Sequence, residues 1–108
     1  MLEMRFIREH PEAVKADLSR RESLEKLSWV DDLLEKDQKW RSLQNQANAL
    51  RQKRNELTEQ ISKLRKKGRD ATEVVREAET IPDKIREYEQ QADALRASID
   101  QVLMQLPN

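Results

Sequence analysis

The chain has 108 residues, of which 39% are charged and 36% are hydrophobic, and its 21 Lys and Arg residues balance its 21 Asp and Glu residues. This length suits one domain, but the low apolar content excludes a thick globular core and favours an elongated arrangement of amphipathic helices. The absence of cysteine excludes disulfides and thiolate metal sites, and no apolar run has the length of a membrane span or the pattern of a signal peptide, so we expect a soluble, intracellular protein.

Residues 1–27 precede the long periodic part of the chain and carry a short apolar pattern of their own. The His-Pro-Glu sequence at 10–12 predicts a helix start, because proline is tolerated in the first helical turn and an acid is favourable near the positive helix end. Val14 and Leu18 follow on one face. We therefore expect one short helix packed at the base of the longer helices, with a break around Arg20–Glu25.

Two long stretches, 28–67 and 71–106, repeat apolar residues at alternating steps of three and four. An average step of about 3.5 residues keeps one stripe facing a partner helix, which is typical of a coiled coil. Residues 68–70 separate the stretches and begin with the only glycine, and a helix that stops and reverses needs a residue that tolerates positive φ. The sequence therefore predicts an all-α fold, a long antiparallel two-helix coiled-coil hairpin with the short N-terminal helix packed at its base.

The two stretches fall into register about the glycine. Facing residues should have numbers that sum to about 138, so that Leu57 meets Ile81. One layer conflicts, because Arg54 opposite Ile85 places a guanidinium in the apolar seam. There Arg54 could pair with an acid such as Glu89 instead of contacting a partner.

Pro82 lies inside the second stretch. It removes the helical hydrogen bond to the carbonyl of Ala78 and clashes with it. We expect a kink at this point with the apolar seam continuing in phase, and a flexible segment beyond the proline is the alternative.

No catalytic constellation is visible in the sequence. One histidine, no cysteine and no glycine-rich loop exclude most nucleophile, metal and phosphate-cradle arrangements. Trp29, Trp40 and Tyr88 lie on or near apolar faces, which favours core packing, and Glu77 and Glu79 are interpreted as solvated helix residues. We expect no catalytic residues in this chain.

Charge is unevenly spread along the chain. Residues 51–69 hold eight basic and two acidic residues, a net charge of +6, whereas residues 70–108 hold four basic and nine acidic residues, a net charge of −5. A solvated helix face is the plain interpretation, but a local basic cluster also suits phosphate and ribose contacts with a structured RNA that is recognised by shape. The candidate RNA-contact residues are Arg51, Lys53, Arg54, Asn55, Lys63, Arg65, Lys66, Lys67, Arg69 and Arg76.

The order of several short motifs resembles the N-terminal part of seryl-tRNA synthetases. In chain order these motifs are Met1–Glu3, Ile7–Val14, Arg51–Leu57, Ile61–Lys63 with the following Lys-Lys-Gly turn, and Leu106–Asn108. The resemblance covers the whole chain, and its motifs are spaced around the predicted hairpin.

The resemblance implies the tRNA-binding arm domain of a cytoplasmic serine–tRNA ligase. Such an arm selects serine tRNA by the shape of its long variable arm and elbow. ATP, Mg²⁺ and the interface of a homodimer would belong to a catalytic domain outside these residues. We therefore expect no cofactor, no metal and no membrane contact in this chain, and a monomer in solution.

Two other classes of protein remain as alternatives. A chaperone subunit of the prefoldin type requires hairpin strands between its helices, and Lys66–Asp70 is too short to supply them. A structural coiled-coil protein would dimerise through the same seam, and a mass measurement in solution would separate it from a self-contained hairpin.

Overall fold

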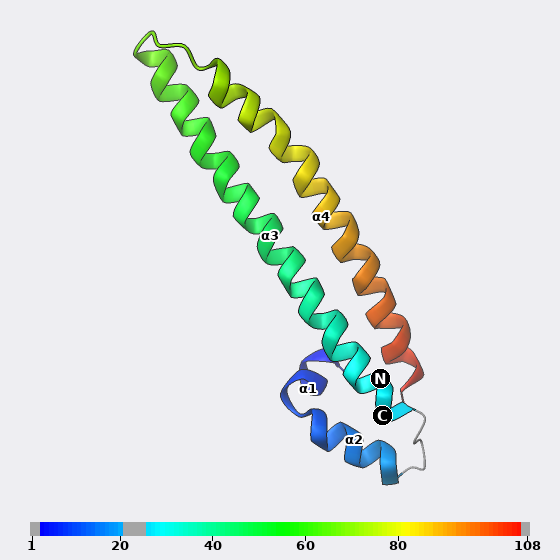
Figure 1. The fold of residues 1–108 in the computed structure, drawn as a ribbon. Helices are drawn as coiled ribbons and strands as arrows, with labels where there is room; N and C mark the ends of the chain where they lie inside the picture. Colours follow the sequence, from blue (N-terminus) through cyan, green and yellow to red (C-terminus); the bar gives the residue numbers. More distant parts are fainter. Residues whose placement is uncertain (1–2, 21–25, 107–108) are drawn as a thin grey trace. The chain divides into compact units, whose positions relative to one another are not determined.

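The computed structural model describes residues 3–20 and 26–106. It contains four helices, α1 (Met4–Glu9), α2 (Pro11–Arg20), α3 (Leu27–Lys66) and α4 (Thr72–Gln105) (Figure 1). No strand occurs within the described ranges. The predicted all-α fold class is confirmed. The break expected around Arg20–Glu25 lies outside the described residues, except for Arg20, which ends α2.

The N-terminal part contains two helices where we predicted one. Pro11 disfavours helical backbone at the residue before it, and His10 takes φ −134° and ψ 56°, so α1 ends and α2 begins at Pro11. The predicted helix start at 10–12 is therefore the start of α2. Helix α1 was missed because its six residues bury only Met4 and Ile7, which is too short a pattern to read as a helix.

The chain divides into two compact units. The first, here called the four-helix unit, comprises Met1–Arg41 and Ala92–Asn108, and the second, the hairpin unit, comprises Ser42–Gln91. Helices α3 and α4 each contribute to both units. Each unit has its own apolar cluster.

The four-helix unit packs α1 and α2 with the first part of α3 and the last part of α4. All four helices contribute to one buried cluster. Its members are Met4, Ile7, Val14, Leu18, Val30, Leu33, Ile99, Leu103 and Leu106. Half-buried Trp29 and Trp40 pack against this cluster, as expected for core aromatics. Apolar residues from both ends of the chain thus form one core, and its burial holds the two short helices on the long ones.

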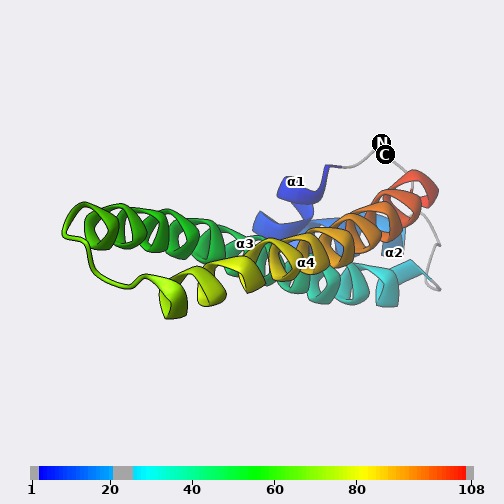
Figure 2. The ribbon, with the colours of Figure 1, turned by 90° about the horizontal axis from the view of Figure 1, so that it is seen from above.

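The hairpin unit consists of the second part of α3 and the first part of α4, which run side by side and antiparallel in both views (Figures 1 and 2). Leu57, Ile81 and Ile85 form its buried cluster, with Leu50, Val74 and Ala78 packed against it. These are residues of the two predicted stripes, and Leu57 and Ile81 share the cluster as the derived register requires.

One predicted layer of the seam is wrong. Arg54 is exposed, and Glu89 pairs with Arg51 instead. A guanidinium in the seam would lose its hydration, so the exposed position is favoured and Ile85 is covered by apolar neighbours.

Helix α4 continues through Pro82 without interruption. Pro82 itself is exposed, and Ile81 and Ile85 on either side of it are buried in the same cluster. The seam therefore stays in phase across the proline, as expected. A kink at this point stays a prediction.

Candidate nucleic-acid interface

The connection between α3 and α4 is fixed by backbone hydrogen bonds around a glycine. Gly68 has φ 69°, its N–H donates to the carbonyl of Arg65 (3.1 Å), and the N–H of Arg69 donates to the carbonyl of Leu64 (2.9 Å). This pattern is a Schellman motif, which satisfies the last carbonyls of a helix and needs a left-handed residue. The positive φ expected at the glycine is confirmed, and the basic residues at 65–69 are held on an ordered turn.

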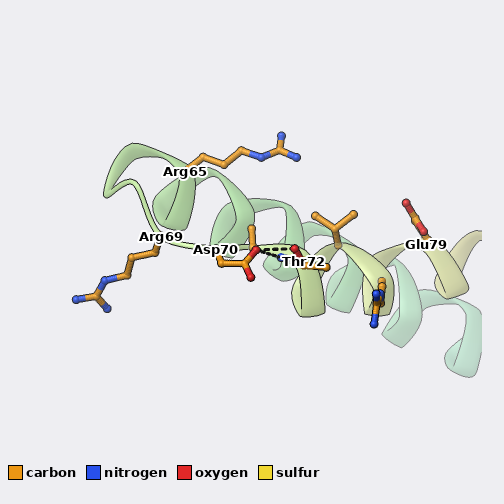
Figure 3. A pocket seen from close by; sticks show the side chains of 8 residues that line it. Arg65, Arg69, Asp70, Thr72 and Glu79 are labelled. Atoms are coloured by element: carbon orange, nitrogen blue, oxygen red, sulfur yellow. Dashed lines mark hydrogen bonds between the residues drawn. The ribbon is translucent and has the colours of Figure 1, made fainter.

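The start of α4 is fixed by an acid of the same turn. Asp70 Oδ1 accepts hydrogen bonds from the backbone N–H of Thr72 (3.0 Å) and from its hydroxyl (2.5 Å) (Figure 3). These two bonds hold the pKa of Asp70 below its ordinary value. The carboxylate thus binds at the positive end of α4.

Beside this turn lies an open hollow with several guanidinium groups. It has a volume of about 520 Å³, and its lining includes Arg65, Arg69 and Arg76, together with Thr72 and Glu79. Figure 3 shows Arg69 extending away from the turn, while Arg65 comes from the neighbouring end of α3. The hollow is open to solvent and polar, which suits a phosphate backbone better than a small apolar ligand.

A second hollow lies along the last turns of α3. It has a volume of about 450 Å³ and is lined by Thr58, Ile61, Ser62, Arg65 and Lys66. Arg65 lines both hollows, so the two surfaces adjoin. Hydroxyl groups beside basic side chains are common donors to phosphate and sugar oxygens.

The predicted contact residues are all in the hairpin unit, but they fall into two classes. Arg51 pairs with Glu89 and also donates from Nη1 to Asn48 Oδ1 (2.7 Å), and Lys53 pairs with Glu77 at 3.2 Å. The remaining basic candidates are exposed and make no ion pair to any described residue. These seven, here called the unpaired cations, are Arg54, Lys63, Arg65, Lys66, Lys67, Arg69 and Arg76. Asn55 is exposed beside Arg54.

Glu77 and Glu89 have partners that the sequence did not predict. Glu77 is expected to be solvated but pairs with Lys53, and Glu89, offered as one acid that Arg54 could pair with, pairs with Arg51. Both acids reach across to α3. Their exposed fractions of about half gave no burial signal, and only the observed register of the two helices reveals their partners.

The described residues offer binding chemistry. Over residues 3–20 and 26–106, no group of three or more His, Cys, Asp or Glu side chains could hold a metal ion. None of the described helices combines the length and apolar character that crossing a membrane requires. The hairpin unit presents a set of unpaired cations, six of which lie on the turn and its two flanking helix ends.

Comparisons with known proteins agree on one family. Residues 1–108 match the family model of the seryl-tRNA synthetase N-terminal domain. Serine–tRNA ligases from Methanocella arvoryzae and Thermococcus sibiricus are 45% and 40% identical to the chain over 108 residues, which is 100% of this chain and 25% and 24% of those proteins.

A solved structure agrees with the sequence relatives. The crystal structure of seryl-tRNA synthetase from Pyrococcus horikoshii complexed with ATP matches 100% of this chain and 24% of that chain, with a TM-score of 0.95 and 42% sequence identity. The chain therefore spans about a quarter of the length of the relatives that it matches.

Proposed function

This chain belongs to the seryl-tRNA synthetase N-terminal domain family, and we propose that it is the part of a serine–tRNA ligase that binds tRNA. Its relatives at 45% and 40% identity are serine–tRNA ligases. The proposal assigns to this chain the positioning of tRNA, and to the rest of a longer enzyme the attachment of serine. ATP, Mg²⁺ and homodimer formation belong, in this proposal, to that remaining part, and the enzyme is cytoplasmic.

The finer proposal concerns which part of the tRNA is bound. The unpaired cations contact phosphates of the long variable arm and the elbow of serine tRNA, and Asn55 adds a neutral donor. Phosphate contacts position an RNA without reading its sequence, so selection follows from the shape that brings those phosphates to the turn.

A single observation carries this proposal. Six of the seven unpaired cations lie between residues 63 and 76, on an ordered turn and its two flanking helix ends. A charge cluster without acidic partners keeps its field available to a polyanion, whereas cations in ion pairs do not. At physiological salt this field reaches only about 8 Å, so the RNA backbone has to come close to the turn.

Charge reversal at the turn tests the proposal. We expect Lys63→Glu, Lys66→Glu and Lys67→Glu together to weaken the binding of serine tRNA by more than about tenfold at moderate salt, because three phosphate contacts are lost. The slope of log affinity against log salt concentration should become shallower by about two to three. Fluorescence titration at several salt concentrations measures both quantities.

A matched control separates the turn from overall charge. Lys39→Glu, Arg41→Glu and Lys84→Glu change the net charge equally, at exposed basic residues that make no ion pair to the described part of the chain. We expect the control to retain most of its affinity. Equal losses in the two triple variants would show that serine tRNA responds to net charge alone, and the proposal would then fail.

A further inference from the structure

We propose that Glu77 and Glu89 are specificity determinants for RNA binding. By holding Lys53 and Arg51 in ion pairs, they mask the two basic residues of the segment 51–69 that lie furthest from the turn. Generic RNA then finds fewer accessible cations in this segment, and binding is concentrated on the unpaired cations, six of which lie between residues 63 and 76. This inference rests on the proposed function and names the residues that restrict which RNAs the chain binds.

The first masked cation is Arg51. Two of its nitrogens are engaged, since Nη2 pairs with Glu89 and Nη1 donates to Asn48 Oδ1 at 2.7 Å. The side chains of Arg51 and Glu89 are 36% and 45% exposed. The guanidinium is therefore reachable by solvent, yet two of its donors already face oxygen acceptors.

The second masked cation is Lys53. Its Nζ lies 3.2 Å from Glu77 Oε1, and about half of each side chain is exposed. Both acids come from α4 and both cations from α3, so each pair joins the two helices of the hairpin unit. Two pairs of the same sense, at positions 51 and 53 of α3, neutralise the two basic residues of the segment 51–69 that precede Arg54.

The basic residues at the turn, unlike Arg51 and Lys53, have no acidic partner among the described residues. The acid of the turn, Asp70, directs its carboxylate to Thr72 at the start of α4, and the unpaired cations make no ion pair to a described residue. Within residues 51–69, which carry a net charge of +6, the basic residues nearest the turn are therefore uncompensated, whereas Arg51 and Lys53 are neutralised by acids of α4.

Exposed ion pairs of this kind stabilise folded proteins little, so stability does not account for them. Their effect on a polyanion is larger. A phosphate that approaches Arg51 or Lys53 must displace a carboxylate and then stay within a Debye length of it, about 8 Å at physiological salt. Because sequence-independent RNA affinity scales with the number of cations that neutralise phosphates, each glutamate removes about one such contact.

This masking affects selectivity more than total affinity. A helix that is basic along its whole length binds any RNA in many positions, and phosphate contacts carry no sequence information. When Arg51 and Lys53 are neutralised, an RNA gains most of its affinity where its shape places phosphates at the unpaired cations between residues 63 and 76.

The test replaces both acids by their neutral, nearly isosteric amides in the 108-residue chain. The variant Glu77→Gln with Glu89→Gln is compared with Glu59→Gln with Glu87→Gln, which changes the charge equally at exposed acids that pair with no described residue. The probes are single-stranded polyuridylic acid and serine tRNA, each titrated at several salt concentrations. Circular dichroism checks the helix content of every variant.

We expect the Glu77/Glu89 variant to bind polyuridylic acid roughly tenfold more tightly, with a salt slope steeper by about 1.4 for two added contacts to a single strand. The affinity of this variant for serine tRNA should rise less, by about threefold, so its preference for serine tRNA over polyuridylic acid falls. The affinity of the control variant for either RNA should differ from that of the original chain by less than about twofold.

Equal behaviour of the two double variants would overturn the proposal. A loss of helix content confined to the Glu77/Glu89 variant would also overturn it, because the pairs would then be structural. Failure of the proposed function looks different: the unmodified chain would not prefer serine tRNA, while the comparison on polyuridylic acid would still decide the masking.

Discussion

At the scale of single residues, the most deeply buried charge in the described chain is Asp37, with 2% of its surface exposed. Arg8 on α1 donates to it twice, from Nε at 2.7 Å and from Nη2 at 2.8 Å. This bond raises the pKa of Arg8 above its ordinary value. A buried carboxylate needs its partner, so the pair fixes where α1 can sit on α3 within the four-helix unit.

We expect Arg8→Met to lower the free energy of unfolding by about 3 kcal/mol, because it leaves the Asp37 carboxylate buried without its cation. Arg5→Met is the matched control on the same helix. Arg5 is 79% exposed and pairs only with Glu9 one turn away, which is worth about 0.5 kcal/mol or less. Urea denaturation followed by circular dichroism measures both, and equal losses would show that the Asp37 pair does not hold α1.

Gly68 supports a second prediction at this scale. A Cβ built on it meets no atom within 4 Å, so the cost of Gly68→Ala comes only from its φ of 69°. We expect a loss of about 1 kcal/mol in the free energy of unfolding, and a smaller loss for Gly68→Asn, because asparagine tolerates the left-handed conformation better. Thermal unfolding compares the variants. An alanine variant as stable as the original would contradict the Schellman motif.

At the scale of elements, much of the fold follows from the sequence because one physical rule governs it. Two stripes with a 3.5-residue step and a glycine between them determine both helices and their register, and the cluster of Leu57, Ile81 and Ile85 has this origin. Helix α1 was not predicted because its apolar pattern is too short. The exposed position of Arg54 was not predicted because a long side chain can turn out of the seam while the apolar stripe continues.

Only the location of the candidate site could be predicted from the sequence. Charge composition locates the basic segment, but it does not say which cations are compensated from the other helix. The pairs Arg51–Glu89 and Lys53–Glu77 depend on side-chain reach across the hairpin unit. The assignment of individual residues to RNA contact stays a prediction.

The start of α4 supports a prediction about pH. The pKa of Asp70 is lowered in the folded chain by its hydrogen bonds from Thr72, so its contribution is fully present above the unfolded value of about 3.9 and is lost as pH falls through the lower folded value. We expect the melting temperature to fall more steeply below about pH 4 in the original chain than in Asp70→Asn. Parallel curves for the two proteins would show that Asp70 does not hold this helix end.

At the scale of the whole molecule, the apolar stripes of α3 and α4 cover each other within one chain. The clusters of both units are made from residues of a single copy. A structural coiled-coil protein that dimerises through the same seam would instead need those residues for its partner.

We therefore expect the chain to sediment as a monomer of 12.8 kDa at micromolar concentration. Leu57→Asp should unfold the hairpin unit without producing a dimer, because it places a charge in the buried cluster of Leu57, Ile81 and Ile85. Sedimentation equilibrium measures the mass. A concentration-dependent dimer that Leu57→Asp dissociates would favour the structural coiled coil.

The most direct measurement of the central claim is a titration of serine tRNA, intact and with its long variable arm deleted, at two salt concentrations. Our account predicts that the intact tRNA binds at least about tenfold more tightly at the lower salt concentration, and that its affinity falls more steeply with salt, because the deletion removes phosphates from the unpaired cations. Equal affinities and equal salt slopes for the two RNAs would contradict selection through the variable arm and leave only general attraction to a polyanion.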